Sequence, residues 1–271
     1  MDWIGVDGCR AGWFAAHMTT DGVFHGSVHT SIASLRDAYP ERGVLIDVPI
    51  GLVADSSGGR ACDREARRVL GGGRASSVFT APTRAATRVD SYEEGSAINA
   101  SLTGKKLSKQ AWGIVPKIAE VDAYLLAADS SERAAVREVH PEVLFWALSG
   151  RTSMTYRKSA AEGIEERLEV LERFAPCVRE AYTECLDSWP RSQVARDDVL
   201  DAFAAAVTGH LGGEHLSTLP ATPEHDGHGL AMEMVYWLAG DGTRGLPSLI
   251  ASGCGPPDGP SETYNAAGGL T

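Results

Sequence analysis

The chain has 271 residues, of which 43% are hydrophobic, and a formal net charge of −11 at pH 7. This length allows one large domain or two small ones, and the negative charge argues against a surface that attracts nucleic acid everywhere. No apolar run approaches the about 20 residues that a membrane-spanning helix needs. The first residues, MDWIGVDGCRAGW, are typical of a strand rather than a basic, apolar leader, so we expect a cytoplasmic protein without membrane contact.

Three strands are predicted at the start of the chain. Residues 2–7 alternate in polarity, which places Ile4 and Val6 on one face of a strand. A glycine-rich turn leads to a second strand over 12–18, and a weaker third strand follows over 22–29. Short turns between neighbouring strands indicate antiparallel pairing.

A helix and a further strand follow these three strands. Residues 31–39 begin with a serine that can cap a helix, and Pro40 ends it. The apolar run over 43–52 reads as a strand that Pro49 interrupts. Together these elements predict an α/β fold with a mixed sheet covered by helices.

Residues 56–130 have a different character and are predicted to form a helical insertion. A short basic helix is expected over about 61–70, between glycine-rich turns. A long helix is expected over 108–128, kinked at Pro116. No linker or change in composition marks the edges of this segment, so we do not expect it to be a separate domain.

The chain then returns to the sheet and closes with helices. A strand over 135–140, a charged helical region over 159–190, a helix over 197–211 and a strand or helix over 229–238 are predicted. We expect a single domain over residues 1–250. Residues 251–271 are rich in glycine, proline and serine, and we expect them to be disordered.

Five acidic residues fall at the ends of these elements: Asp7, Asp47, Glu138, Asp198 and Asp201. Each alone has an ordinary explanation, such as a turn, a helix cap or an ion pair with an arginine. In α/β sheets, however, sites form at the carboxyl ends of strands, where three of these acids are expected. Clustered carboxylates repel unless cations neutralise them, and oxygen ligands suit Mg²⁺ or Mn²⁺. Two such ions about 4 Å apart can activate water for phosphodiester cleavage.

Six segments resemble an uncharacterised family of predicted ribonuclease H-like nucleases, domain of unknown function family 429. In chain order they are VDGCRAGWF, LIDVPIGL, CDREARRVLGGGRASSVFTAP, LSKQAWGIVPKIAEVD, EVHPEVLF and DDVLDAFAAA. The likeness covers nearly all of residues 1–240, and DDVLDAFAAAV is also similar to the final helix of RuvC-type resolvases.

This resemblance implies a ribonuclease H-like mixed sheet, with three antiparallel strands followed by parallel strands and helices on both faces. It implies four catalytic metal ligands, Asp7, Asp47, Glu138 and Asp201, with Asp198 as a further ligand. One residue departs from the resolvase pattern: Asp47 stands where resolvases usually carry the longer glutamate.

Phosphate contacts are predicted mainly from the segment between Arg60 and Arg88, which holds seven arginines and two acids. Guanidinium groups match phosphate oxygens, and glycine-rich turns expose backbone N–H groups. We single out Arg64 and Arg74, and add Lys117 on the predicted long helix.

The leading functional hypothesis is a hydrolase, a Mg²⁺- or Mn²⁺-dependent nuclease acting on an unusual nucleic acid. An actin-like phosphotransferase is a second hypothesis, because VDGCRAG could be a phosphate-binding hairpin, and tight ATP binding would favour it. A third is a non-catalytic binding protein, in which the acids would be dispensable. The sequence distinguishes neither DNA from RNA nor a monomer from an oligomer.

Overall fold

The computed structural model describes residues 2–55 and 58–238. Within these ranges the chain forms ten α-helices, a five-stranded sheet and a two-stranded sheet. The segment predicted to be disordered, 251–271, lies outside the described residues. Among the described residues, no helix combines the length and apolar character that a membrane crossing requires.

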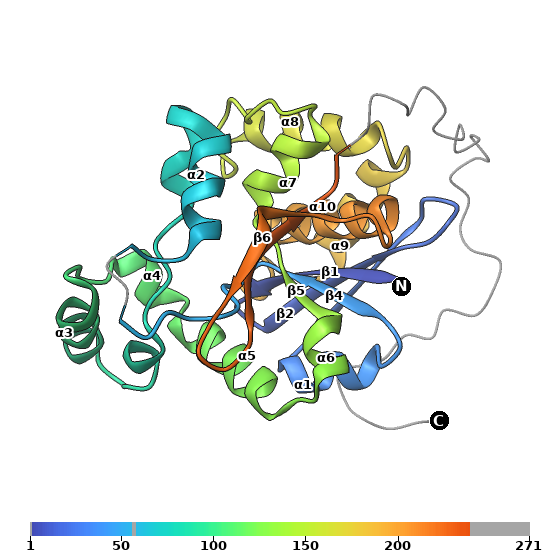
Figure 1. Ribbon diagram of the computed structural model, residues 1–271. Helices are drawn as coiled ribbons and strands as arrows, with labels where there is room; N and C mark the ends of the chain where they lie inside the picture. Colours follow the sequence, from blue (N-terminus) through green and yellow to red (C-terminus); the bar gives the residue numbers. More distant parts are fainter. Residues whose placement is uncertain (1, 56–57, 239–271) are drawn as a thin grey trace.

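The five-stranded sheet is mixed, as predicted (Figure 1). Its strands are β1 (Trp3–Cys9), β2 (Gly12–Met18), β3 (Phe24–His29), β4 (Gly43–Ile46) and β5 (Val136–Glu138). They lie side by side in the order β3-β2-β1-β4-β5. The three N-terminal strands pair antiparallel, whereas β1 with β4 and β4 with β5 pair parallel. The carboxyl ends of β1, β4 and β5 therefore meet at one edge.

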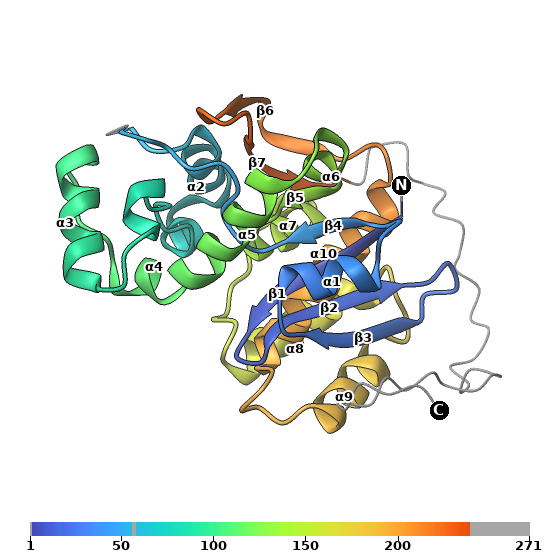
Figure 2. The ribbon, with the colours of Figure 1, turned by 90° about the horizontal axis from the view of Figure 1, so that it is seen from below.

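Helices cover both faces of this sheet. On one face, Ile4 and Val6 belong to a core that includes residues of α1 (Ile32–Ala38) and α5 (Val115–Ala127). On the other face, α10 (Arg196–Gly212) packs across the sheet (Figure 2). Three further helices lie on the α10 side: α7 (Pro141–Leu148), α8 (Ala161–Glu172) and α9 (Val178–Ser188). The alternation predicted for the first strand is confirmed.

The segment between β4 and β5 is largely helical, and its first helices lie beyond the carboxyl ends of the parallel strands (Figure 2). It contains α2 (Ala61–Arg74), α3 (Tyr92–Thr103) and α4 (Lys109–Gly113), with 3-10 turns at Ala75–Ser77 and Arg84–Thr87. The predicted single helix over 108–128 is wrong, because the chain leaves helical geometry at Ile114 and α5 begins at Val115. Pro116 then lies in the first turn of α5, where its missing N–H breaks no hydrogen bond.

The C-terminal part of the described chain adds a feature that the sequence pattern did not predict. After α6 (Ser130–Ala135) and the helices above, β6 (Ser217–His225) pairs antiparallel with β7 (Ala231–Tyr236). Residues 229–238, predicted to form either a strand or a helix, therefore contain the strand β7. Two prolines inside β6 and a register shift between Leu219 and Glu224 interrupt its pattern.

Helix α10 lies directly on β1 because small residues face each other. A Cβ added at Gly5 would lie 2.1 Å from the carbonyl oxygen of Ala202 and 2.3 Å from the backbone nitrogen of Ala206. Ala205 approaches the same position. The run of small residues on α10 is thus the condition for close contact between this helix and the strand.

Gly5→Ala is expected to lower the free energy of unfolding by about 3 kcal/mol, at the upper end of the range for overpacked cores. The added methyl group would meet backbone atoms of α10, which cannot rotate away. Gly72→Ala is the control, because no atom lies within 4 Å of the position of its added Cβ. Urea unfolding of both variants measures the difference, and equal midpoints for Gly5→Ala and the wild type would contradict this account.

Candidate functional site

Three of the predicted acids meet at the carboxyl edge of the sheet. Asp7, Asp47 and Asp201 each offer a carboxylate oxygen, and these oxygens all lie within 4.8 Å of one another. Asp7 belongs to β1, Asp47 follows β4 directly, and Asp201 lies in the second turn of α10. We call these three residues the aspartate cluster.

The fold explains why these three carboxylates converge. The parallel register pairs Val6 with Ile46, so the next residues along the two strands, Asp7 and Asp47, are neighbours. The backbone N–H of Asp47 donates to the carbonyl oxygen of Val6 at 3.0 Å and extends this pairing by one residue. Asp201 precedes Ala202, whose contact with Gly5 holds α10 against β1.

A lysine that the sequence analysis did not single out lies beside the aspartate cluster. The Lys158 ammonium group is 2.8 Å from Oδ2 of Asp201 and 3.4 Å from Oδ2 of Asp197. The other oxygen of Asp201 is buried and has no hydrogen-bond partner among the described residues. Asp7 accepts a 2.7 Å hydrogen bond from the backbone N–H of Gly8. The cluster thus has more carboxylate oxygens than protein donors.

The electrostatics of the cluster follow from burial and crowding of like charges. Burial, then the charges of Asp47 and Asp201, raise the pKa of Asp7 well above its ordinary value. Burial and the charge of Asp201 raise the pKa of Asp47 to about 8. Burial also raises the pKa of Asp201, although Lys158 opposes that rise. Crowded, buried carboxylates of this kind are stabilised by an added cation.

Asp198 lies near the cluster but has a different immediate role. Its carboxylate accepts a 2.8 Å hydrogen bond from the backbone N–H of Ala195 and so caps the start of α10. Burial raises the pKa of Asp198 to about 6. The residue contributes negative charge to the cluster, while its oxygen is directed to the helix terminus.

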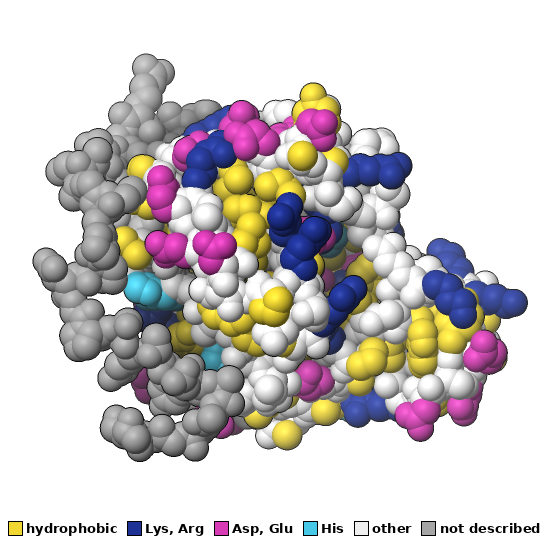
Figure 3. All heavy atoms as spheres, turned by 180° about the vertical axis from the view of Figure 1, so that it is seen from behind, with side chains coloured by type: hydrophobic (Ala, Val, Ile, Leu, Met, Phe, Trp, Pro, Cys, Tyr) yellow, Lys and Arg dark blue, Asp and Glu magenta, His cyan; other side chains and the backbone are white. Residues whose placement is uncertain are grey.

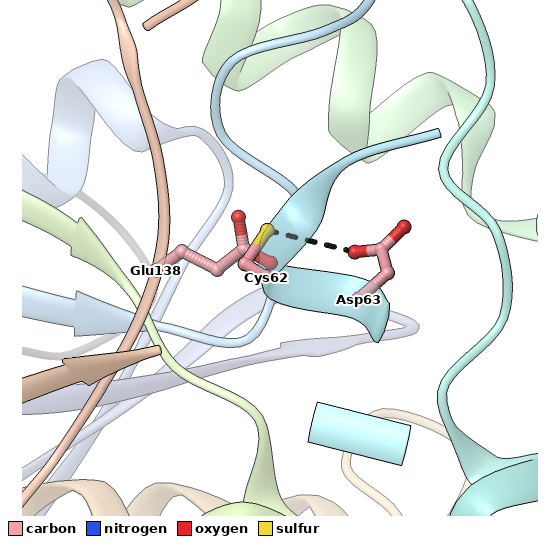
Figure 4. Close-up of side chains that lie close together, drawn as sticks. All are labelled: Cys62, Asp63 and Glu138. Carbon is pink, nitrogen blue, oxygen red and sulfur yellow. Dashed lines mark hydrogen bonds between the residues drawn. The ribbon is translucent and has the colours of Figure 1, made fainter. Parts of the chain in front are cut away.

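Glu138 belongs to a second group of side chains, shown in Figure 4 with Cys62 and Asp63. The guanidinium group of Arg60, buried at 1% exposure, binds both oxygens of Glu138 at 2.6 and 2.7 Å. It also donates to Oδ1 of Asp63 at 2.6 Å. The backbone N–H of Ile50 completes the shell of Glu138 at 2.7 Å. We call Arg60, Asp63 and Glu138 the arginine network.

The two groups differ in what they can hold. In the arginine network a guanidinium group already supplies positive charge to both carboxylates, and burial still raises the pKa of Glu138 to about 7. In the aspartate cluster, three carboxylates offer oxygen ligands, the set that Mg²⁺ and Mn²⁺ prefer, and one oxygen has no donor among the described residues. The aspartate cluster therefore fits a divalent cation better.

Comparison with known families supports the relationship indicated by the six sequence segments. A family model described as a protein of unknown function (DUF429) matches residues 5–225. The chain belongs to the DUF429 family. Neither the curated proteins nor the solved structures include a match. The range matched in this DUF429 chain contains both the aspartate cluster and the arginine network.

The predicted phosphate contacts of this DUF429 protein are engaged in internal hydrogen bonds. Arg64 donates to the carbonyl oxygens of Gly58 and Gly59 at 2.8 and 2.9 Å. Arg74 donates to the carbonyl oxygens of Met154, at 2.7 Å, and Tyr156. These guanidinium groups tie neighbouring loops to α2 through the loops' backbone carbonyl oxygens.

Lys117, the third predicted phosphate contact, lies over the turn between β1 and β2. Its ammonium group donates to the carbonyl oxygen of Gly12 at 2.5 Å and stands 4.3 Å from the centre of the Trp13 ring. A Cβ added at Gly8 would lie 2.6 Å from Cδ of Lys117, so this glycine makes room for the lysine stem.

Sequence reasoning missed three charged residues at the two groups, Lys158, Arg60 and Asp63. Arg60 was counted among the clustered arginines, and its position just before α2 gave no sign that it would be buried. Lys158 lies between α7 and α8, with no motif around it. It is one of only five lysines in the chain, a signal that could have drawn attention to it.

The stability of the metal-free DUF429 protein is expected to fall as pH rises from about 6.5 to about 8. In this range the unfolded aspartates, with an ordinary pKa of 3.8, are ionised, whereas Asp47, with a pKa of about 8, still holds a proton in the folded state. The folded state then binds more protons than the unfolded state, so the free energy of unfolding decreases as pH rises. Histidines with a lowered pKa act in the opposite direction, but this effect fades as pH rises above their ordinary value of 6.5.

Thermal unfolding in EDTA at several pH values across this range measures the slope. Asp47→Asn is the control and should flatten it. A stability that stays level or rises between pH 6.5 and pH 8 would contradict the electrostatic account of the cluster.

Proposed function

We propose that this protein is a divalent-cation-dependent phosphodiester hydrolase, a nuclease with a ribonuclease H-like fold. The observation that carries the proposal is the convergence of Asp7, Asp47 and Asp201 from three elements, with oxygens within 4.8 Å of one another. Such a buried oxygen set, with too few protein donors, matches the requirements of Mg²⁺ or Mn²⁺.

The order of elements supports the same proposal. Three antiparallel strands precede a parallel strand, and the cluster draws on β1, the residue after β4, and the last long helix, α10. This is the order that the resemblance to predicted ribonuclease H-like nucleases implies. The family description itself names no activity, so the reaction is inferred from the site.

The chemistry assigned to each residue follows from its position. Bound Mg²⁺ or Mn²⁺ would activate water and stabilise the leaving oxygen in phosphodiester cleavage. Asp7, Asp47 and Asp201 would hold the ions, and the backbone N–H of Gly8 orients the carboxylate of Asp7. The arginine network keeps Glu138 at the edge of the site, where its charge acts on Asp47. Asp198 adds negative charge that favours cation binding.

Cleavage assays test this proposal directly. End-labelled single-stranded, duplex and branched DNA and RNA are incubated with the protein and Mn²⁺, and separately with EDTA. We expect cleavage of at least one substrate with Mn²⁺ and none with EDTA or with Asp201→Asn. Asp187→Asn, which changes an exposed aspartate away from the cluster, is the matched control and should cleave normally. Cleavage that survives both EDTA and Asp201→Asn would contradict the proposal.

A further inference from the structure

A pocket of about 560 Å³ adjoins the aspartate cluster. Lys158 and Asp197 line it at the side of the cluster, and the opposite wall comes from α8, α9 and the start of α10. Its volume lies within the range of about 300–1,000 Å³ that is usual for small-molecule sites. Because Lys158 contacts Asp201 at 2.8 Å, the pocket and the cluster share a wall.

Two arginines give this pocket a positive charge that the structure does not use elsewhere. Arg191 and Arg196 both line the pocket, and both are exposed. Neither guanidinium group forms a hydrogen bond or ion pair within the described part of the chain, in contrast to Arg64 and Arg74. Asp197 is the one acidic residue lining the pocket, and it lies 3.4 Å from Lys158.

The rest of the wall is apolar. Ile164 of α8 and Leu186 of α9 line the pocket with the ring of Tyr182, which is 6% exposed. Arg191 and Arg196 line the same pocket as this ring. An apolar wall beside paired guanidinium groups fits a ligand that joins a phosphate to a sugar and base.

Figure 3 shows the back of the molecule, where Lys and Arg side chains gather around the middle of the face between the main body and the protruding insertion. On this face, Lys and Arg side chains lie close to one another although the protein as a whole is acidic. Local positive charge is enough to guide a phosphate backbone toward a site despite the net charge of −11.

We propose that this pocket binds the nucleotide next to the phosphodiester that is cut, with Arg191 and Arg196 holding its phosphate and Tyr182, Ile164 and Leu186 contacting its sugar and base. The inference rests on the proposed function and deepens it, because it identifies where the substrate strand lies. It replaces Arg64 and Arg74, which hold backbone carbonyls, as the phosphate contacts.

Calorimetric titration with thymidine 3′,5′-bisphosphate in EDTA tests the pocket without any cleavage. We expect wild-type protein to bind this probe, and Arg191→Ala/Arg196→Ala to bind it at least about tenfold more weakly, because the double variant loses two charged donors to the phosphate. Arg64→Ala is the matched control and should bind as the wild type does. Thymidine, which has no phosphate, should bind far more weakly than the bisphosphate.

Three results would overturn the assignment. In the first, wild-type protein does not bind the bisphosphate at millimolar concentration. In the second, the double variant binds it as tightly as the wild type does. In the third, Arg64→Ala loses binding and the double variant does not. The titration and the cleavage assay separate the two proposals. Binding that depends on both arginines, without cleavage of any substrate, retains the pocket and rejects the hydrolase. Metal-dependent cleavage, together with unchanged binding by the double variant, retains the hydrolase and rejects the pocket.

Discussion

Asp7→Asn is expected to abolish metal-dependent hydrolysis while making the metal-free protein more stable. Losing a side chain that merely supports a metal ligand costs up to about a hundredfold in affinity or activity, so losing a ligand should cost more. At the same time the substitution removes a carboxyl group that is costly to ionise, because burial and the charges of Asp47 and Asp201 raise the pKa of Asp7. The asparagine keeps the oxygen that accepts the N–H of Gly8.

The gain in the free energy of unfolding at pH 8 should be at least about 1 kcal/mol, because each pKa unit corresponds to about 1.4 kcal/mol. Thermal unfolding in EDTA measures the gain, and titration with Mn²⁺ measures the loss of binding. The matched control is Asp187→Asn, an exposed aspartate on α9, which should change neither quantity. A variant that binds Mn²⁺ normally, or one that is less stable without metal, would contradict the assignment of Asp7.

Arg60→Met is expected to cause the largest loss of stability among the arginine variants, about 3–5 kcal/mol, since it leaves buried charges without their partner. Arg60 is 1% exposed, and its guanidinium group joins Glu138 to Asp63. Urea unfolding at pH 7 measures the loss.

Arg64→Met is the matched control, because Arg64 lies one turn further along α2 and is exposed. It should change the free energy of unfolding by no more than about 0.5 kcal/mol. Neutralising both acids, with Asp63→Asn and Glu138→Gln, should recover part of the loss in Arg60→Met. A loss below about 1 kcal/mol for Arg60→Met would show that the network is not the structural unit described above.

Much of the sheet could be predicted because its residues obey simple periodic rules. Ile4 and Val6 alternate with residues of the opposite face, and glycine-rich turns separate β1 from β2. Strand β6 could not be predicted, since two prolines and a register shift obscure its period. The break before α5 was missed because Pro116 is compatible both with a kink and with a helix start.

The aspartate cluster could be predicted in part, because strand ends and a helix start locate Asp7, Asp47 and Asp201 before any contact is known. The contacts of Glu138 could not be predicted, because they depend on Arg60, which lies 78 residues away in the sequence. The seven closely spaced arginines between Arg60 and Arg88 cannot be told apart by sequence pattern. Burial distinguishes Arg60 from Arg64, and it depends on how α2 packs against α7, β6 and β7.

Crystals of the protein grown with Mn²⁺ and measured for anomalous scattering test the central claim most directly. We expect a Mn²⁺ peak bound by oxygens of Asp7, Asp47 and Asp201, at metal–oxygen distances of about 2.0–2.3 Å. The Lys158 ammonium group should then have moved away from Asp201. A Lys158–Asp201 ion pair that persists at millimolar Mn²⁺, with no anomalous peak among the three carboxylates, would contradict the metal site and with it the proposed hydrolase.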